Sequence, residues 1–372
     1  MKIEKTILLI LFTFLFIACN PKQKKIKNDL IGAWSKIDSN LNSPPSPPGI
    51  PPFGIRFSKD TVEYLNGFLR YDLDSISKKR KLNFKGIYSD YKINNDSIFI
   101  LNPFDKVWEF KWEISKVKKD TLILTKDRTD FMQLKKVELV ENNDFDQIIL
   151  SKTGCYGSCS IIDISLNKKG EFYFYGESYV DPLGVYKSQI DSVTVNKVFS
   201  KFAHAYNSLL NENSSNKIKK THNNSLIKSN HTDDSSFITT LFKDGKIIKT
   251  IENHNSSITK ELIWAYTPLQ YLYTQTELKS VSIKTQNQPV INYFRLKKND
   301  EMVILDKSEY FYLWLELQKS KVVETEFNST YYTEPILPSK AKNLVMIESD
   351  GRFFKFIFED KNPITFDLGY NL

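Results

Sequence analysis

Two cysteines stand four residues apart, and they are the residues of this chain best suited by type and spacing to chemistry. A thiol pair can form a disulfide, hold a metal ion or exchange electrons with a substrate. In an extended strand, residues four apart lie about 13 Å apart, whereas a disulfide needs Cα atoms within about 7 Å. The chain must therefore turn between Cys155 and Cys159, and Gly154 and Gly157 permit that turn.

The four histidines are the next candidates for chemistry. His222 and His231 could assemble a metal site with Asp233 and Asp234, but no H-x3-H or C-x2-C spacing supports one. We interpret the histidines as loop residues, and we expect no metal, no cofactor and no catalytic residue. The four positions are His204, His222, His231 and His254.

The N-terminus indicates export. Lys2 and Lys5 precede an apolar run from Ile7 to Ile17, which is the pattern of a signal peptide. Eleven helical residues reach only about 17 Å, too short for a hydrocarbon core of about 30 Å. Ala18 before Cys19 resembles the lipobox of bacterial lipoproteins, which implies removal of residues 1–18 and lipid attachment to Cys19.

Export and the basic segment that follows define the expected location and partners. Residues 19–28 are polar and basic, and we interpret them as a tether with nothing to pack. We expect a protein anchored to the outer membrane through lipid on Cys19, facing the periplasm. The formal net charge of +8 comes from scattered lysines, so we expect no nucleic-acid partner, and the candidate partner is an envelope protein or a glycan.

An oxidising compartment favours a disulfide between Cys155 and Cys159. Closing so short a loop contributes roughly 2 kcal/mol to stability on the chain-entropy estimate. A thiol-redox role is the alternative, although thioredoxin-like sites have C-x2-C at a helix N-terminus and β residues follow here. Thiolates that bind a metal, or one cysteine acting as a nucleophile, are further alternatives.

Residues 29–138 have the alternation of a β meander. In Val107 to Ile114 it places Trp108, Phe110, Trp112 and Ile114 on one face, which we expect to be buried. The other strand candidates are Gly54–Phe57, Thr61–Leu65, Leu82–Ile93, Ser97–Leu101, Thr121–Thr125 and Phe131–Val137. Such a meander predicts a small antiparallel barrel, which removes free sheet edges.

Gly32-Ala33-Trp34 at the start of this meander resembles the lipocalin-like domains of bacterial lipoproteins. The resemblance implies that Trp34 packs near the closed end of a barrel. The barrel either carries an apolar ligand in its lumen or fills the lumen with its own aromatic side chains, and the large aromatic side chains favour the self-packed barrel.

Residues 145–278 follow a polar stretch that marks a domain boundary, and their pattern predicts an α+β domain. A helix over Val195–Leu209 has a core-facing stripe that Ser192 or Thr194 can cap, and a second helix covers Ser257–Tyr273. Asp244-Gly245 predicts a hairpin. The Gly-Cys-x-Gly-x-Cys motif at 154–159 and these elements resemble an uncharacterised domain family common in lipoproteins of Bacteroidota, for which no activity is established.

Residues 285–372 are also predicted to be an α+β region, with strands and one strongly apolar helix. Asp306 and Glu309 stand in capping-box spacing before Tyr310, Leu313 and Trp314. A helix this apolar either lies in a core or offers a site for a partner, and the core is the expectation.

The chain is therefore expected to be β-rich and α+β, with an N-terminal antiparallel barrel and one or two α+β domains. The function that fits these patterns is a non-catalytic binding or structural module. A thiol-redox protein and an apolar-ligand carrier are the alternatives.

Overall fold

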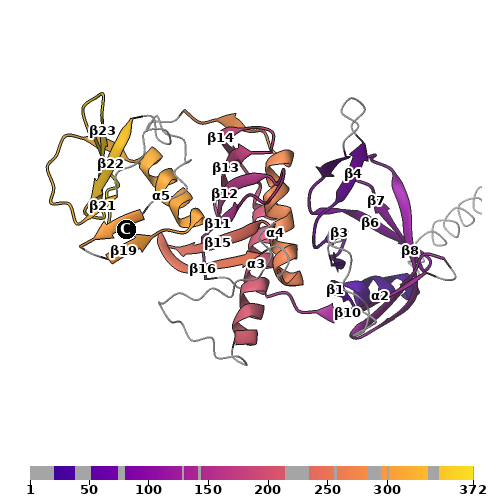
Figure 1. Ribbon diagram of the computed structural model, residues 1–372. Helices are drawn as coiled ribbons and strands as arrows, with labels where there is room; N and C mark the ends of the chain where they lie inside the picture. The colour runs from indigo at the N-terminus through magenta and orange to yellow at the C-terminus, as the bar shows by residue number, and fades with distance from the viewer. Residues whose placement is uncertain are drawn as a thin grey trace, which may run out of the picture. The chain divides into compact units, whose positions relative to one another are not determined.

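The computed structural model describes residues 21–37, 52–73, 80–127, 130–140, 144–213, 234–254, 258–282, 295–299, 301–333 and 343–371. Two compact units account for the fold (Figure 1). The first comprises residues up to 141 together with 260–275, and the second comprises 142–259 and 276–372.

The first unit contains a closed antiparallel β-barrel of eight strands. Once a two-stranded insertion is set aside, each strand pairs with the next along the chain, and the last pairs with the first. The strands are β1 (Gly32–Lys36), β2 (Gly54–Phe57), β3 (Thr61–Tyr64), β6 (Tyr88–Asn94), β7 (Ser97–Leu101), β8 (Trp108–Lys118), β9 (Thr121–Thr125) and β10 (Phe131–Val137). The predicted N-terminal antiparallel barrel is therefore confirmed.

Alternating side chains fill the interior of this barrel. In β7 and β9 every second residue is buried, which is the signature of a strand with one face in a core. The buried set comprises Leu30, Trp34, Ile55, Phe57, Val62, Phe68, Tyr91, Ile98, Ile100, Ile114, Leu122, Leu124 and Leu134. These side chains occupy the lumen, so this part of the barrel is self-packed.

A short helix packs on the barrel where the sequence predicted an unpacked tether. Helix α2 (Pro21–Leu30) contacts β6 and β8, and its Ile26 and Leu30 join the barrel core. Lys27 pairs with Asp60, in the turn between β2 and β3, at 2.9 Å. Spacing of Ile26 and Leu30 by four residues gives the otherwise basic segment one apolar face. We call the end that carries α2 the closed end.

The insertion between β3 and β6 is a hairpin of β4 (Leu69–Leu73) and β5 (Arg80–Phe84), which forms a separate two-stranded sheet. The first unit also contains α4 (Lys260–Tyr271) and the 3₁₀ helix η2 (Leu272–Gln275), where Pro268 stands inside the predicted second helix. The indole N–H of Trp264 donates to the Pro52 carbonyl at 3.0 Å, and this bond holds α4 near the start of β2.

The second unit begins with a seven-stranded antiparallel sheet in the order β16-β15-β11-β12-β13-β14-β17. Asp244 and Gly245 have positive φ angles in the β15–β16 hairpin, which confirms the turn predicted from that pair. The strands are β11 (Gln147–Lys152), β12 (Ile161–Asn167), β13 (Glu171–Ser178), β14 (Gly184–Gln189), β15 (Ser236–Lys243), β16 (Lys246–His254) and β17 (Lys279–Ser280).

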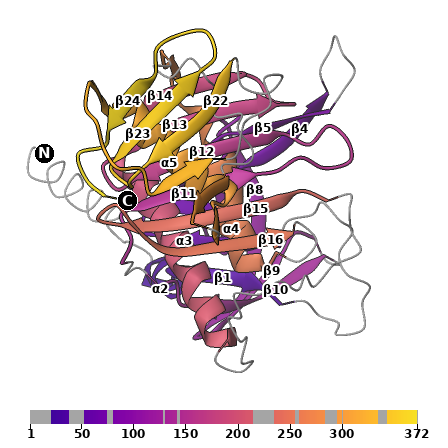
Figure 2. The ribbon, with the colours of Figure 1, turned by 60° about the vertical axis from the view of Figure 1, so that its left-hand side comes forward.

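Helix α3 (Ser192–Asn213) lies along one face of this sheet (Figures 1 and 2). It buries Val195, Val198, Phe199 and Phe202, as their spacing predicts. Its cap is neither Ser192 nor Thr194, because the backbone N–H of Thr194 donates to Asp191 Oδ1 at 2.9 Å. An aspartate one residue before the helix satisfies the free N–H more directly than the hydroxyls within it.

Helix α5 (Lys307–Lys319) lies against the other face of the sheet, between it and a second seven-stranded sheet. The second sheet has the order β19-β18-β21-β22-β23-β24-β20 (Figure 2). Its strands are β18 (Arg295–Lys298), β19 (Glu301–Ile304), β20 (Lys321–Val323), β21 (Tyr331–Thr333), β22 (Leu344–Ser349), β23 (Phe353–Phe358) and β24 (Ile364–Asp367).

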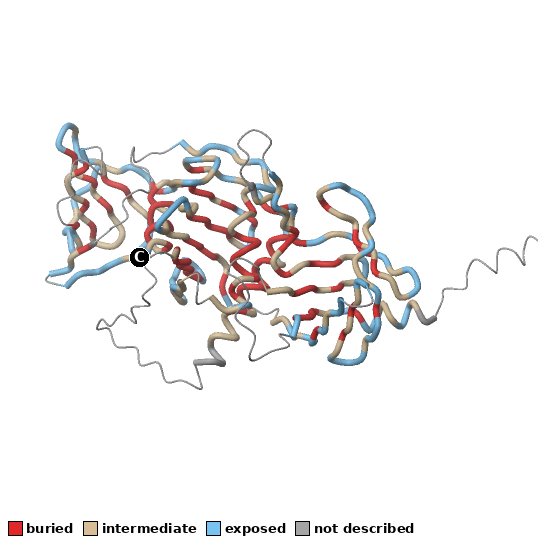
Figure 3. The backbone as a smooth tube through the Cα atoms, turned by 45° about the vertical axis from the view of Figure 1, so that its right-hand side comes forward, coloured by how far each residue is buried: buried red, intermediate tan, exposed pale blue. Residues whose placement is uncertain are grey.

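The position of α5 explains its composition. Phe311, Trp314 and Leu315 pack toward the first sheet, whereas Leu313 and Leu317 pack toward the second. The Asp306 backbone N–H donates to Glu309 Oε2 at 3.0 Å, which confirms the predicted capping box. Figure 3 shows buried residues along the strands of the sheet. A helix that is apolar all round is expected where two layers cover it.

Candidate functional site

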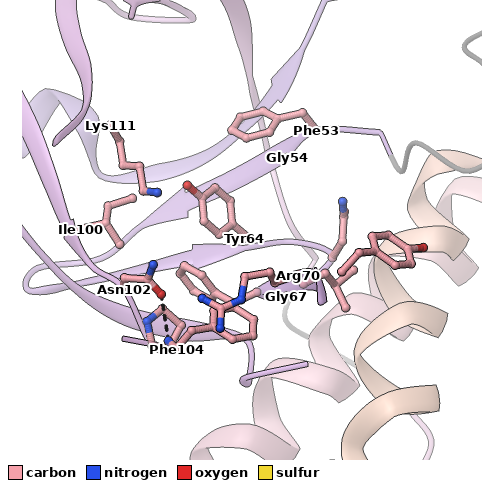
Figure 4. Close-up of a pocket in the computed structure, with 14 residues that line it drawn as sticks. Phe53, Gly54, Tyr64, Gly67, Arg70, Ile100, Asn102, Phe104 and Lys111 are labelled. Carbon is pink, nitrogen blue, oxygen red and sulfur yellow. Dashed lines mark hydrogen bonds between the residues drawn. The ribbon is translucent and has the colours of Figure 1, made fainter. Parts of the chain in front are cut away.

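The barrel end opposite the closed end, which we call the mouth, contains a cavity of about 570 Å³ (Figure 4). Its walls come from the start of β2, the end of β3, the β4 strand of the inserted hairpin and the β7–β8 connection. The apolar lining consists of Phe53, Tyr64, Phe68, Leu69, Tyr71, Ile100, Pro103 and Phe104. A volume of this size lies within the range that accommodates a small molecule.

A β-bulge in β8 supplies the charged pair at this mouth. Ile98 pairs with Trp112 and Phe99 pairs with Phe110, so Lys111 is an extra residue with no partner across the ladder. A bulge shifts the alternation of a strand by one residue. Lys111 therefore lines the cavity.

Because of the bulge, the prediction of which β8 side chains face the core is partly wrong. Trp112 and Ile114 pack into the barrel as expected, but Trp108 and Phe110 are 43% and 44% exposed and lie outside the core. Glu109, predicted to face solvent, pairs with Lys111 at 2.5 Å and accepts a hydrogen bond from Asn102 at 2.6 Å. These two bonds lower the pKa of Glu109 and keep it ionised.

Arg70, on the inserted hairpin, connects two sides of the mouth. Its Nη1 lies 2.9 Å from Asp105 Oδ2 in the β7–β8 connection, and its Nε lies 2.8 Å from Asp72 Oδ1. The guanidinium carbon stands 4.4 Å from the ring centroid of Phe104. Two carboxylates and an aromatic face hold this side chain at one position beside the cavity.

Two polar groups of the cavity wall have open hydrogen-bonding capacity within the described residues. Asn66 Oδ1 is buried and has no hydrogen-bond partner there. Tyr64 makes edge contacts with the rings of Phe53, Phe68 and Trp112, and burial raises the pKa of its phenol, so the hydroxyl keeps its proton. A buried amide oxygen without a partner costs about 1–3 kcal/mol.

The cysteine pair lies in the second unit, in the connection from β11 to β12. Cys155 and Cys159 form a disulfide with Cα atoms 5.6 Å apart. Gly157 N–H donates to the Cys155 carbonyl at 2.8 Å, which closes the turn that the spacing requires. Tyr156 between them is exposed. The disulfide lies within the connection between two paired strands and closes a loop of that connection.

The histidines do not converge on a site among the described residues. His204 lies on α3, and His254 Nδ1 is 2.9 Å from Ser236 Oγ at the end of β16. No group of three metal-ligating side chains occurs in the described part of the chain. Cys19, His222, His231 and Asp233 lie outside the described residues.

A buried ionic cluster joins α5 to the first sheet of the second unit. Lys307 Nζ lies 2.6 Å from Asp163 Oδ2 and 3.3 Å from Glu177 Oε2, and Ser151 Oγ donates to Asp163 Oδ1 at 2.5 Å. Burial raises the pKa of Asp163 despite the lysine and the hydroxyl. Sequence reasoning did not identify this cluster, since Asp163 and Lys307 are 144 residues apart. The cluster holds α5 in place.

Within the described ranges, no helix has the length and hydrophobicity needed to cross a bilayer.

Comparison with known proteins gives one match. Residues 146–273 match a family described as a domain of unknown function (DUF6438). No curated protein and no solved structure matches the chain. The matched range includes the disulfide, strands β11–β16 and helices α3 and α4. The resemblance of this region to an uncharacterised family is thus confirmed, and residues 146–273 are a DUF6438 domain.

Proposed function

We propose that this protein is an exported, lipid-anchored binding protein of the outer membrane, facing the periplasm, whose barrel mouth takes a small ligand. The observation that carries the proposal is the 570 Å³ cavity, which combines aromatic walls with a buried Asn66 oxygen that has no partner in the described residues. Apolar walls with a few fixed polar groups are the usual composition of a ligand site.

The polar groups at the mouth favour recognition over catalysis. Lys111 and Glu109 neutralise each other, and Arg70 is held between Asp72 and Asp105. A general base works best with a pKa near the working pH, whereas the pKa of Glu109 is lowered. The ion pairs hold these side chains in fixed positions, which suits binding, and none of these carboxylates is arranged as a general base.

The position of α2 supports an anchor at the closed end. Cys19 precedes Pro21, the first residue of α2, by two residues, and two residues span at most about 7 Å of backbone. Lys24 and Lys25 on α2 are exposed, and each contributes about 1 kcal/mol beside an anionic lipid surface. An anchor there leaves the mouth directed away from the membrane that holds the lipid.

Replacing Cys19 with alanine is expected to release the protein from the membrane fraction. Each buried acyl CH₂ contributes roughly 0.8 kcal/mol, so loss of two or more chains removes stable anchoring. Fractionation of cells that express Cys19→Ala, with radiolabelled palmitate incorporation, measures this. Cys155→Ser/Cys159→Ser is the matched control and should stay membrane-bound. Membrane retention and labelling of Cys19→Ala would contradict the anchor.

Filling the cavity is expected to weaken binding of a neutral aromatic probe, 1-aminoanthracene, by about tenfold or more. Leu69→Trp on β4 places a larger side chain in the cavity wall. Leu73→Trp on the same strand is the control, because Leu73 is 65% exposed and does not line the cavity. Fluorescence titration of the purified protein measures both. Equal affinity for the two variants would show that the probe binds elsewhere than the mouth.

A further inference from the structure

The charges around the mouth cavity are already paired, which bears on the charge of its ligand. Lys111 is paired with Glu109, and Arg70 is paired with both Asp72 and Asp105. A charged ligand would therefore meet side chains that already carry a partner of opposite charge. These pairs are partly exposed, so a ligand charge that joins one of them gains little. The site therefore favours a neutral ligand.

The mouth cavity still offers both hydrogen-bond donors and a hydrogen-bond acceptor. Asn66 Oδ1 is a buried acceptor without a partner in the described residues, and exchanging the amide O and N would leave a donor there instead. Arg70 donates from Nη1 to Asp105, and its Nε lies 2.8 Å from Asp72 Oδ1 without a hydrogen bond. The N–H groups of Nη2 remain, and Lys111 retains N–H groups beyond the one directed at Glu109. A hydroxyl is the neutral group that both donates and accepts.

The depth of the cavity limits the shape of the ligand. Ile100 lines it and belongs to the barrel core, which also contains the fully buried side chains of Trp34 and Leu134. A long acyl chain would have to replace this packed core. The aromatic rings lie at the mouth itself, with the ring centroid of Tyr64 4.6 Å from that of Phe68 and 5.8 Å from that of Phe53. Flat apolar faces at a shallow site suit a ring rather than a chain.

We infer that the mouth cavity binds a neutral, hydroxyl-bearing ring, a sugar residue of a glycan, with its C–H face against the aromatic wall and its hydroxyls on Asn66, Arg70 and Lys111. This inference rests on the proposed binding function and names the chemical class of its ligand. The sugar can come from a short free saccharide or from the end of a polysaccharide chain.

The test is a calorimetric titration of the complete, purified protein with three classes of probe. Methyl β-glucopyranoside, N-acetylglucosamine and maltotriose represent short neutral saccharides, soluble dextran represents a polymer, and dodecanoate and 1-aminoanthracene represent apolar ligands. We expect a saccharide to bind, with a chemical-shift change at the side-chain amide of Asn66 in the NMR spectrum. Binding of the short saccharides identifies a free sugar, whereas binding of dextran alone identifies a chain.

Asn66→Leu separates hydrogen bonding from cavity shape. It should weaken saccharide binding by about tenfold or more while 1-aminoanthracene affinity stays within about threefold, because only the saccharide uses the amide. Asn94→Leu is the matched control, since Asn94 is exposed in the β6–β7 hairpin at the closed end. It should leave both affinities unchanged.

Two outcomes overturn the inference in different ways. If dodecanoate or 1-aminoanthracene binds and every saccharide fails, the cavity is a binding site and the assigned ligand class is wrong. If no probe of any class binds, the proposed binding function fails with it. Equal loss of saccharide and aminoanthracene affinity in Asn66→Leu would also overturn the assigned role of the amide.

Discussion

Replacing Lys307 with methionine is expected to lower the free energy of unfolding of the second unit by about 3–5 kcal/mol. Lys307 Nζ lies 2.6 Å from Asp163 Oδ2, and Asp163 is 2% exposed. The substitution keeps most of the aliphatic length of the side chain but leaves a buried carboxylate without its cation. An uncompensated buried charge is among the most destabilising single changes in a protein.

The size of this loss should depend on pH. Burial already raises the pKa of Asp163 in the wild type, and removal of Lys307 raises it further. When the pKa of a carboxyl is higher in the folded protein than in the unfolded chain, the protonated carboxyl stabilises the fold. This contribution is complete below the unfolded pKa of about 3.9 and is lost as the pH rises through the folded pKa. The difference between Lys307→Met and wild type should therefore be largest near neutral pH and should shrink as pH falls toward about 4.

Hydrogen exchange of peptides from β12 and α5, measured across denaturant series between about pH 4 and pH 8, reports the stability of this unit. Lys319→Met on the same helix is the control, because Lys319 is 47% exposed and pairs with Glu316 at 2.8 Å, so its loss should stay within about 1 kcal/mol. Asp163→Leu combined with Lys307→Met should recover much of the stability. If Lys307→Met and Lys319→Met lower the free energy of unfolding equally at every pH, the buried pair does not stabilise the packing of α5.

The strands could be predicted from the sequence because alternation is a local property. The bounds of β2, β7, β9 and β10 match the predicted ranges, and closure of the barrel followed from their number. In β8, Trp108 and Phe110 were misplaced because the extra residue at Lys111 inverts the alternation. Whether a strand contains a bulge depends on its partner strand and not on its own residues.

The candidate site was less predictable for a related reason. β4 was missed because Arg70 and Asp72 make Leu69–Leu73 look like a polar turn, and their partners at Asp105 and Asn83 lie outside the segment. The mouth cavity depends on that hairpin. Helix α2 was missed because only Ile26 and Leu30 reveal its apolar face within a basic segment. Long-range pairing determines each of these features.

Replacing Trp34 with alanine is expected to lower the free energy of unfolding of the first unit by about 3–5 kcal/mol. Trp34 is 0% exposed, and its indole N–H donates to the Leu30 carbonyl at 2.8 Å, at the last residue of α2. The change therefore opens a cavity in the barrel core and removes the bond that attaches the helix to β1. Trp34→Phe removes the bond but keeps an aromatic ring, so its loss should be smaller.

Trp108→Ala is the matched control, because Trp108 belongs to the same barrel but is 43% exposed. Its loss should stay below about 1 kcal/mol, since exposed side chains contribute little packing. Because a chain of two units need not unfold in one step, hydrogen exchange of barrel peptides is the appropriate measurement. In Trp34→Ala, amides of α2 should lose protection together with those of β1. Retention of α2 protection, or equal losses for the two tryptophans, would show that Trp34 does not join the closed end to the barrel core.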